Sequence, residues 1–211
     1  MPKAKPEIEP KISAVIFDIG NVFVRWDPRN LYSQHFEDKE EMEYFLNTVT
    51  TAEWNLAQDA GRSFADATAL LTAKFPHYGD MIALYDSHWV ETLGGEISGV
   101  KEILLSLKRQ GFPLYAITNF SAEKWPVFCE KYAFTKEFQD TIVSGEVGLT
   151  KPGREIYELA IKRFDLVPKR SIFIDDSLPN VRGAEAAGMR GFHFTGVEAL
   201  VAKLKALNLL F

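Results

Sequence analysis

Hydrophobic positions follow two different periods along this chain. Short, nearly continuous apolar runs rich in β-branched residues are typical of strands that are buried on both faces. These runs occupy residues 12–17, 112–117, 141–143, 171–174 and 191–194. Between and after them, apolar positions recur at helical spacing over residues 100–110, 122–132, 154–164, 181–187 and 197–207. Strands that alternate with helices predict an α/β fold with a doubly wound parallel sheet covered by helices on both faces.

The segment after the first run has a different character. Over residues 28–95 aromatic and aliphatic side chains recur at helical spacing, and no stretch has the pattern of a buried strand. Several short helices are therefore expected, inserted between the first strand and the rest of the sheet. We predict an all-helical cap over residues 25–95 and an α/β core over 12–24 and 96–211. Residues 1–11 are expected to form a disordered tail.

Composition narrows the class of protein. With 211 residues and 46% hydrophobic side chains, the chain can bury a substantial core. A net charge of -5 argues against nucleic acid as a partner, since phosphate backbones are bound by clustered Lys and Arg. No run approaches the ~20 apolar residues that span a bilayer, so no membrane association is expected. A single cysteine, Cys129, excludes an intrachain disulfide and favours a cytoplasmic protein. We expect the protein to be either a monomer or a homodimer.

Polar residues gather where the predicted strands end. Asp18 follows the first strand, Thr118-Asn119 the second, Lys151 the third and Asp175-Asp176 the fourth. In a parallel sheet these strand ends share one edge, which is where ligands bind. The sequence therefore predicts a site made of three carboxylates, one ammonium group and two small hydrogen-bonding side chains.

The chemistry of such a site follows from its charges. Adjacent carboxylates repel one another, and they stay ionised together only beside a cation. Oxygen ligands alone favour Mg²⁺. Asp18, held by the metal and by Lys151, would be a deprotonated nucleophile able to form an acyl phosphate. The Thr118 hydroxyl, the Asn119 backbone N–H and Lys151 would hold the phosphate oxygens that carry charge during transfer.

Four segments together resemble the motifs of the haloacid dehalogenase (HAD) superfamily. They are Phe17-Asp18-Ile19-Gly20-Asn21-Val22, Ile117-Thr118-Asn119, Lys151-Pro152 and the stretch from Phe173 to Asn180. The resemblance is to HAD phosphatases with a small helical cap, including glucose-1-phosphate-type sugar-phosphate phosphatases. It implies Asp18 and Lys151 as catalytic residues and Mg²⁺ bound by Asp18, the Gly20 carbonyl, Asp175 and Asp176. It also implies substrate binding by Asn21, Thr118, Asn119 and Lys151, with Asn180 supporting the metal loop.

One position departs from the family pattern. HAD phosphatases usually carry a second Asp two residues after the nucleophile as general acid and base, and here that residue is Gly20. General acid catalysis is worth ~10²–10⁴-fold, so its loss slows the reaction without preventing it. A 2-haloacid dehalogenase, a phosphotransferase, a receiver-like domain and a catalytically weak HAD-fold binding protein are the alternatives. Because dehalogenases replace the acidic pair that this chain keeps, Asp175 and Asp176 favour a metal-dependent phosphatase.

The predicted function is therefore a Mg²⁺-dependent phosphomonoester hydrolase that forms an aspartyl phosphate on a small, sugar-phosphate-like substrate. The cap is expected to select that substrate. Its candidate contacts are Arg25, Trp26, Trp54, Asn55, Arg62, His88 and Trp89.

Overall fold

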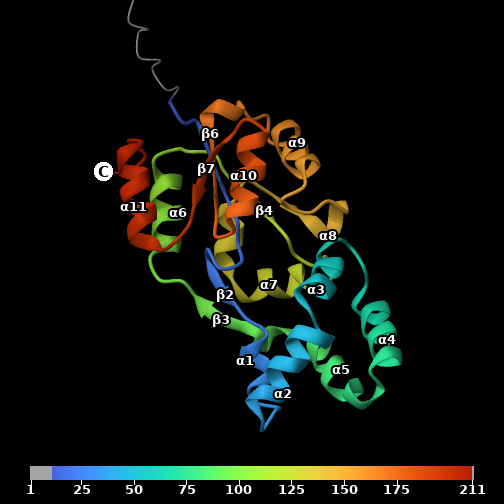
Figure 1. The fold of residues 1–211 in the computed structure, drawn as a ribbon. Helices are drawn as coiled ribbons and strands as arrows, with labels where there is room; N and C mark the ends of the chain where they lie inside the picture. The colour runs from blue at the N-terminus through green and yellow to red at the C-terminus, as the bar shows by residue number, and fades with distance from the viewer. Residues whose placement is uncertain (1–10, 211) are drawn as a thin grey trace, which may run out of the picture.

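A five-stranded parallel sheet lies at the centre of the structure, a computed structural model that describes residues 11–210 (Figure 1). Its order is β5-β4-β1-β6-β7, with every neighbouring pair parallel. The strands are β1 (Ala14–Phe17), β4 (Leu114–Thr118), β5 (Asp140–Val143), β6 (Ser171–Asp175) and β7 (Arg190–His193). All five strands expected from apolar runs are present, and β1 occupies the middle of the sheet.

Alternate residues of each strand pack into different cores. Ile16 and Phe173 belong to a cluster on one face, whereas Val15, Phe17 and Ile174 belong to a cluster on the other. This alternation follows from the period of two in an extended strand. One face is covered by α9 (Arg154–Arg163) and α10 (Leu178–Ala186). The other is covered by α6 (Val100–Arg109), α7 (Trp125–Lys131) and α11 (Val197–Ala206). The predicted doubly wound α/β fold is confirmed.

A block of short helices lies beyond the carboxyl ends of the strands (Figure 1). It contains α1 (Arg29–Tyr32), α2 (Lys39–Tyr44), α3 (Ala52–Asp59), α4 (Phe64–Lys74) and α5 (Gly79–Ser87), which we call the cap. Two of these helices begin at hydroxyl caps: Thr51 accepts from the Trp54 N–H, and Ser63 accepts from the Asp66 N–H. The helical character expected for this insertion is confirmed.

A two-stranded antiparallel sheet, which the sequence pattern did not predict, joins the cap to the rest of the molecule. It pairs β2 (Val24–Trp26) with β3 (Leu93–Glu96), where the chain enters and leaves the cap. The boundaries predicted at residues 24/25 and 95/96 fall inside this sheet and stay predictions. Most of the predicted N-terminal tail lies outside the described residues. Within residues 11–210, no helix is long and apolar enough to cross a membrane.

Candidate active site

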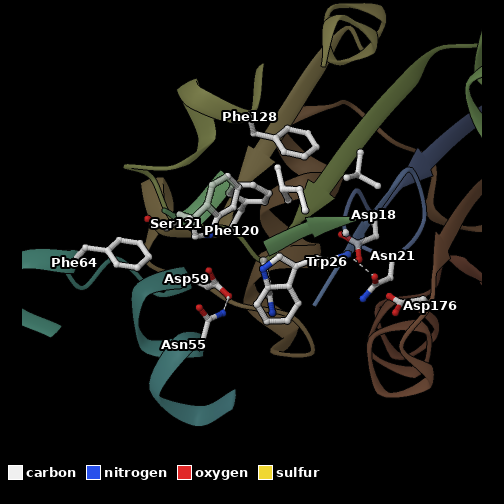
Figure 2. A pocket seen from close by; sticks show the side chains of 15 residues that line it. Asp18, Asn21, Trp26, Asn55, Asp59, Phe64, Phe120, Ser121, Phe128 and Asp176 are labelled. Atoms are coloured by element: carbon white, nitrogen blue, oxygen red, sulfur yellow. Dashed lines mark hydrogen bonds between the residues drawn. The ribbon is translucent and has the colours of Figure 1, made fainter. Parts of the chain in front are cut away.

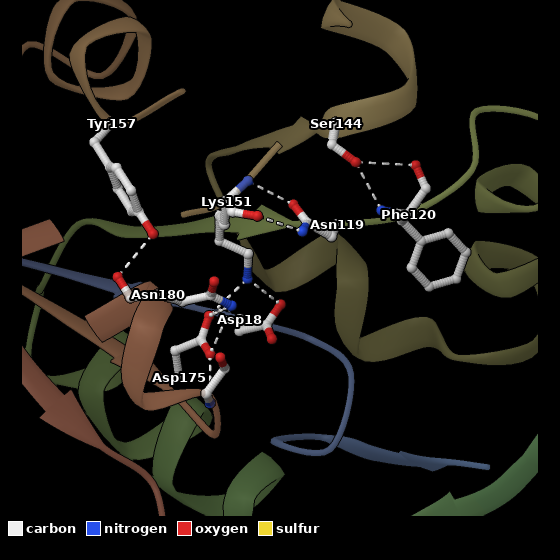
Figure 3. Close-up of polar contacts among 9 residues, drawn as sticks. Asp18, Asn119, Phe120, Ser144, Lys151, Tyr157, Asp175 and Asn180 are labelled. Carbon is white, nitrogen blue, oxygen red and sulfur yellow. Dashed lines mark hydrogen bonds and ion pairs between the residues drawn. The ribbon is translucent and has the colours of Figure 1, made fainter. Parts of the chain in front are cut away.

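A buried lysine joins two carboxylates at the ends of the central strands (Figure 3). Asp18 follows β1 directly, Asp175 is the last residue of β6, and Lys151 lies in the loop between α8 (Ser144–Val147) and α9. The Lys151 Nζ is 2.8 Å from Asp18 Oδ1 and 2.7 Å from Asp175 Oδ2, and its side chain is 1% exposed. The sheet therefore brings together three residues that are far apart in the sequence.

Asp175 uses both of its oxygens within the protein. Oδ1 accepts from the Ser177 N–H at 2.7 Å, and the Asn180 Nδ2 donates to both oxygens at 3.1 Å. The Tyr157 hydroxyl in turn donates to the Asn180 carbonyl at 2.7 Å. Asp175 is thus a fully hydrogen-bonded support for Lys151. Its neighbour Asp176 faces the pocket described below.

Carboxylate oxygens of Asp18, Asp175 and Asp176 lie within 4.8 Å of one another. Burial raises the pKa of Asp18 to about 7, an effect that Lys151 opposes and the two other aspartates reinforce. Burial, followed by the charge of Asp175, also raises the pKa of Asp176. For Lys151 burial lowers the pKa, but Asp18 and Asp175 outweigh it and the net shift is upward, so the ammonium stays charged.

The charge balance of this cluster fits a divalent cation. Three carboxylates and one ammonium group leave two formal negative charges uncompensated. The available donors are oxygens alone, the set that Mg²⁺ prefers. Asp18 and Asp176 are the carboxylates that face open space. The donor set and its charge therefore suit Mg²⁺.

A cavity of about 210 Å³ opens between this cluster and the cap (Figure 2). One end is polar, with Asp18, Asn21, Asn119 and Asp176. The walls are mainly apolar and aromatic. They are formed by Val24, Trp26, Phe64, Trp89, Leu93, Phe120 and Phe128. The remaining lining residues are Gly20, Asn55, Asp59 and Ser121.

The residues predicted from strand ends divide into two layers. Asp18, Gly20, Asn21, Asn119 and Asp176 line the cavity, whereas Thr118, Lys151 and Asp175 are buried outside its lining. The Asn119 side chain accepts from the Lys151 N–H at 2.8 Å and donates to the Lys151 carbonyl at 2.9 Å. Asn119 therefore holds the loop that carries Lys151. Asn21 accepts from the Trp26 N–H at 2.9 Å and so positions an aromatic wall of the cavity.

Three of the predicted cap contacts line the cavity: Trp26, Asn55 and Trp89. The others lie outside its lining. Arg62 donates to Gln58 Oε1 at 2.7 Å and to the Trp54 carbonyl at 2.9 Å, so its guanidinium is used within the cap. Trp54 packs edge-on against Tyr85 as part of the cap's own core.

Asp59, the last residue of α3, lines the cavity and was not predicted. It lies at no strand end and in none of the four motif segments. The available signal was a polar pair at helical spacing, since Asn55 and Asp59 are four residues apart and hydrogen-bond at 3.2 Å.

The comparisons with known proteins agree with this geometry. The model of the haloacid dehalogenase-like hydrolases matches residues 12–188, a segment that contains β1, the cap and the β6 end. The chain belongs to the haloacid dehalogenase-like hydrolase family. The resemblance found from the four motifs is confirmed.

Among this hydrolase's relatives is the sesquiterpene phosphatase astK of Aspergillus oryzae, 29% identical over 195 residues, covering 92% of this chain and 95% of the relative. Protein CbbY of Cereibacter sphaeroides is 26% identical, covering 93% and 94%.

Solved HAD structures share the fold. The putative HAD-hydrolase YfnB from Bacillus subtilis, bound to magnesium, has a TM-score of 0.72 at 18% identity, covering 94% of this chain and 100% of that one. A HAD family enzyme from Bacteroides thetaiotaomicron, in complex with magnesium and inorganic phosphate, has a TM-score of 0.65 at 22% identity. That alignment covers 88% of this chain and 95% of the Bacteroides enzyme.

Proposed function

We propose that this hydrolase is a Mg²⁺-dependent phosphomonoesterase that forms an aspartyl phosphate on Asp18. The observation that carries the proposal is the buried Lys151 between Asp18 and Asp175, with Asp176 facing the same cavity. Relatives named as phosphatases, and a HAD enzyme solved with magnesium and inorganic phosphate, support it. Cytoplasmic location and a monomeric or homodimeric state stay part of the proposal.

The residues at and behind the polar end of the cavity have different proposed roles. Lys151 binds Asp18 Oδ1, which leaves the other oxygen to attack phosphorus. Lys151, the Thr118 hydroxyl and the Asn119 backbone N–H would hold the non-bridging phosphate oxygens. Asp18, the Gly20 carbonyl and Asp176 would hold Mg²⁺, with Asp175 behind them, and the bound metal would neutralise charge that develops on the phosphoryl group.

The first test is phosphate release. With Mg²⁺ present, the wild-type enzyme should release inorganic phosphate from phosphomonoesters, and Asp18→Asn should abolish turnover because the amide is no nucleophile. Asp80→Asn, which removes an exposed carboxylate of the cap, should leave the rate unchanged. Removal of Mg²⁺ by a chelator should stop the reaction, and readdition should restore it.

Two results would refute this assignment. One is turnover that survives Asp18→Asn, and the other is a rate that a chelator does not affect. Halide release from a 2-haloacid that proceeds without Mg²⁺ would favour the dehalogenase instead.

The walls of the cavity favour an apolar organic group on the phosphate. Seven lining residues are aliphatic or aromatic, and within residues 11–210 none of the residues that line the cavity is Lys, Arg or His. A polyhydroxylated sugar would leave those of its hydroxyls that lie against these rings without hydrogen bonds, which is costly. We therefore propose a prenyl-like monophosphate ahead of the sugar phosphate that the motifs suggested. The relative named as a sesquiterpene phosphatase supports this choice.

Substrate preference can be measured directly. We expect a higher kcat/KM for a prenyl monophosphate than for a hexose 1-phosphate. Trp26→Ser should lower the prenyl value by about tenfold, because roughly 1.4 kcal/mol of apolar contact is lost. It should change the value for a short alkyl phosphate little, since that substrate does not reach the ring. Tyr44→Ser, at an aromatic residue that is 52% exposed on the cap, is the matched control. A preference for the hexose phosphate would overturn the apolar assignment.

A further inference from the structure

One carboxyl group in the cavity lies apart from the metal-binding cluster. Of the residues that line the cavity, Asp18, Asp176 and Asp59 are acidic. Figure 2 shows Asp59 and Asn55 on the side of the cap and Asp18 and Asp176 on the other side. Asp59 comes from the last turn of α3, so the cap itself delivers an acidic group to the reaction space.

The Asp59 side chain is oriented by a short chain of hydrogen bonds. The Tyr85 hydroxyl donates to Asn55 Oδ1 at 2.9 Å, so the Asn55 amide nitrogen is the atom that faces Asp59. That nitrogen donates to Asp59 Oδ2 at 3.2 Å. Asn55 therefore contacts one oxygen of Asp59, and the residue lines the cavity.

The Asp59 backbone is fixed from the opposite side. The Ser144 hydroxyl donates to the Asp59 carbonyl at 2.5 Å and accepts from the Phe120 N–H at 2.8 Å. Ser144 begins α8, directly after β5 of the central sheet. Ser144 thus fixes the position of Asp59, a residue of the cap, relative to the strand ends.

The surroundings of Asp59 favour the protonated acid. Among the described residues it forms no ion pair. Burial raises its pKa to about 7, while the charge of Lys151 and the backbone N–H of Ser121 oppose the shift. A carboxyl group with such a pKa can both give and take a proton near neutral pH.

The loop after β1 offers no second acid beside Asp18. A Cβ atom at Gly20 would meet nothing within 4 Å, so the space is open there, but glycine supplies no proton. Displacement at phosphorus is in line, which places the leaving oxygen on the side opposite the nucleophile. For Asp18 as nucleophile, that side is the cap side of the cavity.

We infer that Asp59 is the general acid and base of this enzyme, in place of the aspartate that Gly20 lacks. This rests on the proposed phosphatase function. As Asp18 bonds to phosphorus, the ester P–O bond breaks and its electron pair stays on the leaving oxygen, which takes the Asp59 proton to become an alcohol. Water then attacks the aspartyl phosphate, Asp59 takes a proton from that water, and the Asp18–P bond breaks to release inorganic phosphate.

The test compares esters whose leaving groups differ in their need for a proton. An alkyl phosphate needs one, whereas para-nitrophenyl phosphate does not. Asp59→Asn should lower kcat/KM for the alkyl ester by about 10²-fold or more and change that for the aryl ester little. The parameter is kcat/KM because it reports formation of the aspartyl phosphate. Glu53→Gln removes an exposed carboxylate from the same helix and should leave both values unchanged.

Wild-type enzyme provides a second measurement that does not depend on a variant folding. With a proton donor in place, wild-type kcat/KM should vary little across esters of increasing leaving-group basicity. A steep fall across that series in the wild type, or an equal loss for both esters in Asp59→Asn, would overturn the assignment of Asp59. Failure of the wild type to release phosphate from any ester would instead refute the proposed function.

Discussion

At the scale of single residues, the site depends on one ammonium group, that of Lys151, which two carboxylates share. Lys151 lies between Asp18 and Asp175, and its side chain is almost fully enclosed. Taking such charges out of water is costly, and the cost is repaid only when every partner stays in place. The positions of Asp18 and Asp175 at strand ends were predicted from the sequence, whereas Lys151, expected directly after the third strand, lies beyond α8. The contact of Lys151 with Asp18 was expected too, but its bond to Asp175 was not, because a loop sequence does not fix where a lysine side chain points.

Removal of Lys151 should therefore cost far more stability than removal of an exposed lysine. Lys151→Met keeps most of the side-chain length but leaves Asp18 and Asp175 buried without a cation. We expect the free energy of unfolding to fall by about 3–5 kcal/mol, measured by urea denaturation without added Mg²⁺. Lys108 makes an exposed pair with Glu137 at 2.7 Å, and Lys108→Met should cost about 1 kcal/mol or less. Equal costs for the two variants would show that the buried triad adds nothing to stability.

The identity of Asp59 as a site residue also belongs to this scale. A candidate site residue can be identified from the sequence where it follows a predicted strand, as Asp18 and Asp176 do. Asp59 sits at the end of a cap helix, and its place beside the strand ends depends on how α3 packs. Only the folded chain shows that contact, made through Ser144.

At the scale of elements, the apolar runs predicted the parallel strands most clearly at the centre of the sheet, where β1 and β6 are buried on both faces. All four residues of β1 are buried, and so are all five of β6. The β2–β3 pair lacks that signal: β3 alternates between partly buried and exposed residues and contains Gly94-Gly95. A short, half-exposed strand of this kind is stabilised by pairing with a distant strand. Arg25 of β2 donates to the carbonyl of Glu96 in β3, which is 71 residues away in the sequence. Local pattern carries no information about such a partner.

Helix ends show the same division between local and tertiary causes. The helices over 154–163 and 197–206 lie within a residue of the predicted ranges. The helix predicted from residue 122 instead begins at Trp125, with Pro126 in its first turn. Proline is favoured there because its missing N–H has no partner at a helix start. The residues before it form a turn that ties Ser121 to the cavity lining.

At the scale of the whole molecule, the active site lies between two parts of the chain that supply different chemistry. The sheet edge provides Asp18, the proposed nucleophile, together with Lys151 and the carboxylates that we propose as metal ligands. The cap provides Phe64 of the aromatic wall and, by our inference, Asp59 as the acid that the β1 loop lacks. A reaction that needs both sides requires the cap to hold a fixed position over the strand ends. Ser144 is fully buried and joins the two through its hydroxyl.

Ser144→Ala should therefore loosen the cap near the site. The substitution leaves the Phe120 N–H and the Asp59 carbonyl without this partner, at a cost of about 1–3 kcal/mol. Amide hydrogen exchange over residues 57–62 should become faster, and kcat/KM for an alkyl phosphate should fall because Asp59 is displaced. Ser87→Ala is the matched control, since that exposed hydroxyl bonds Ala83 and His88 of its own segment. If exchange over 57–62 is unchanged in Ser144→Ala, apolar packing alone positions the cap, and the hydroxyl has no part in placing Asp59.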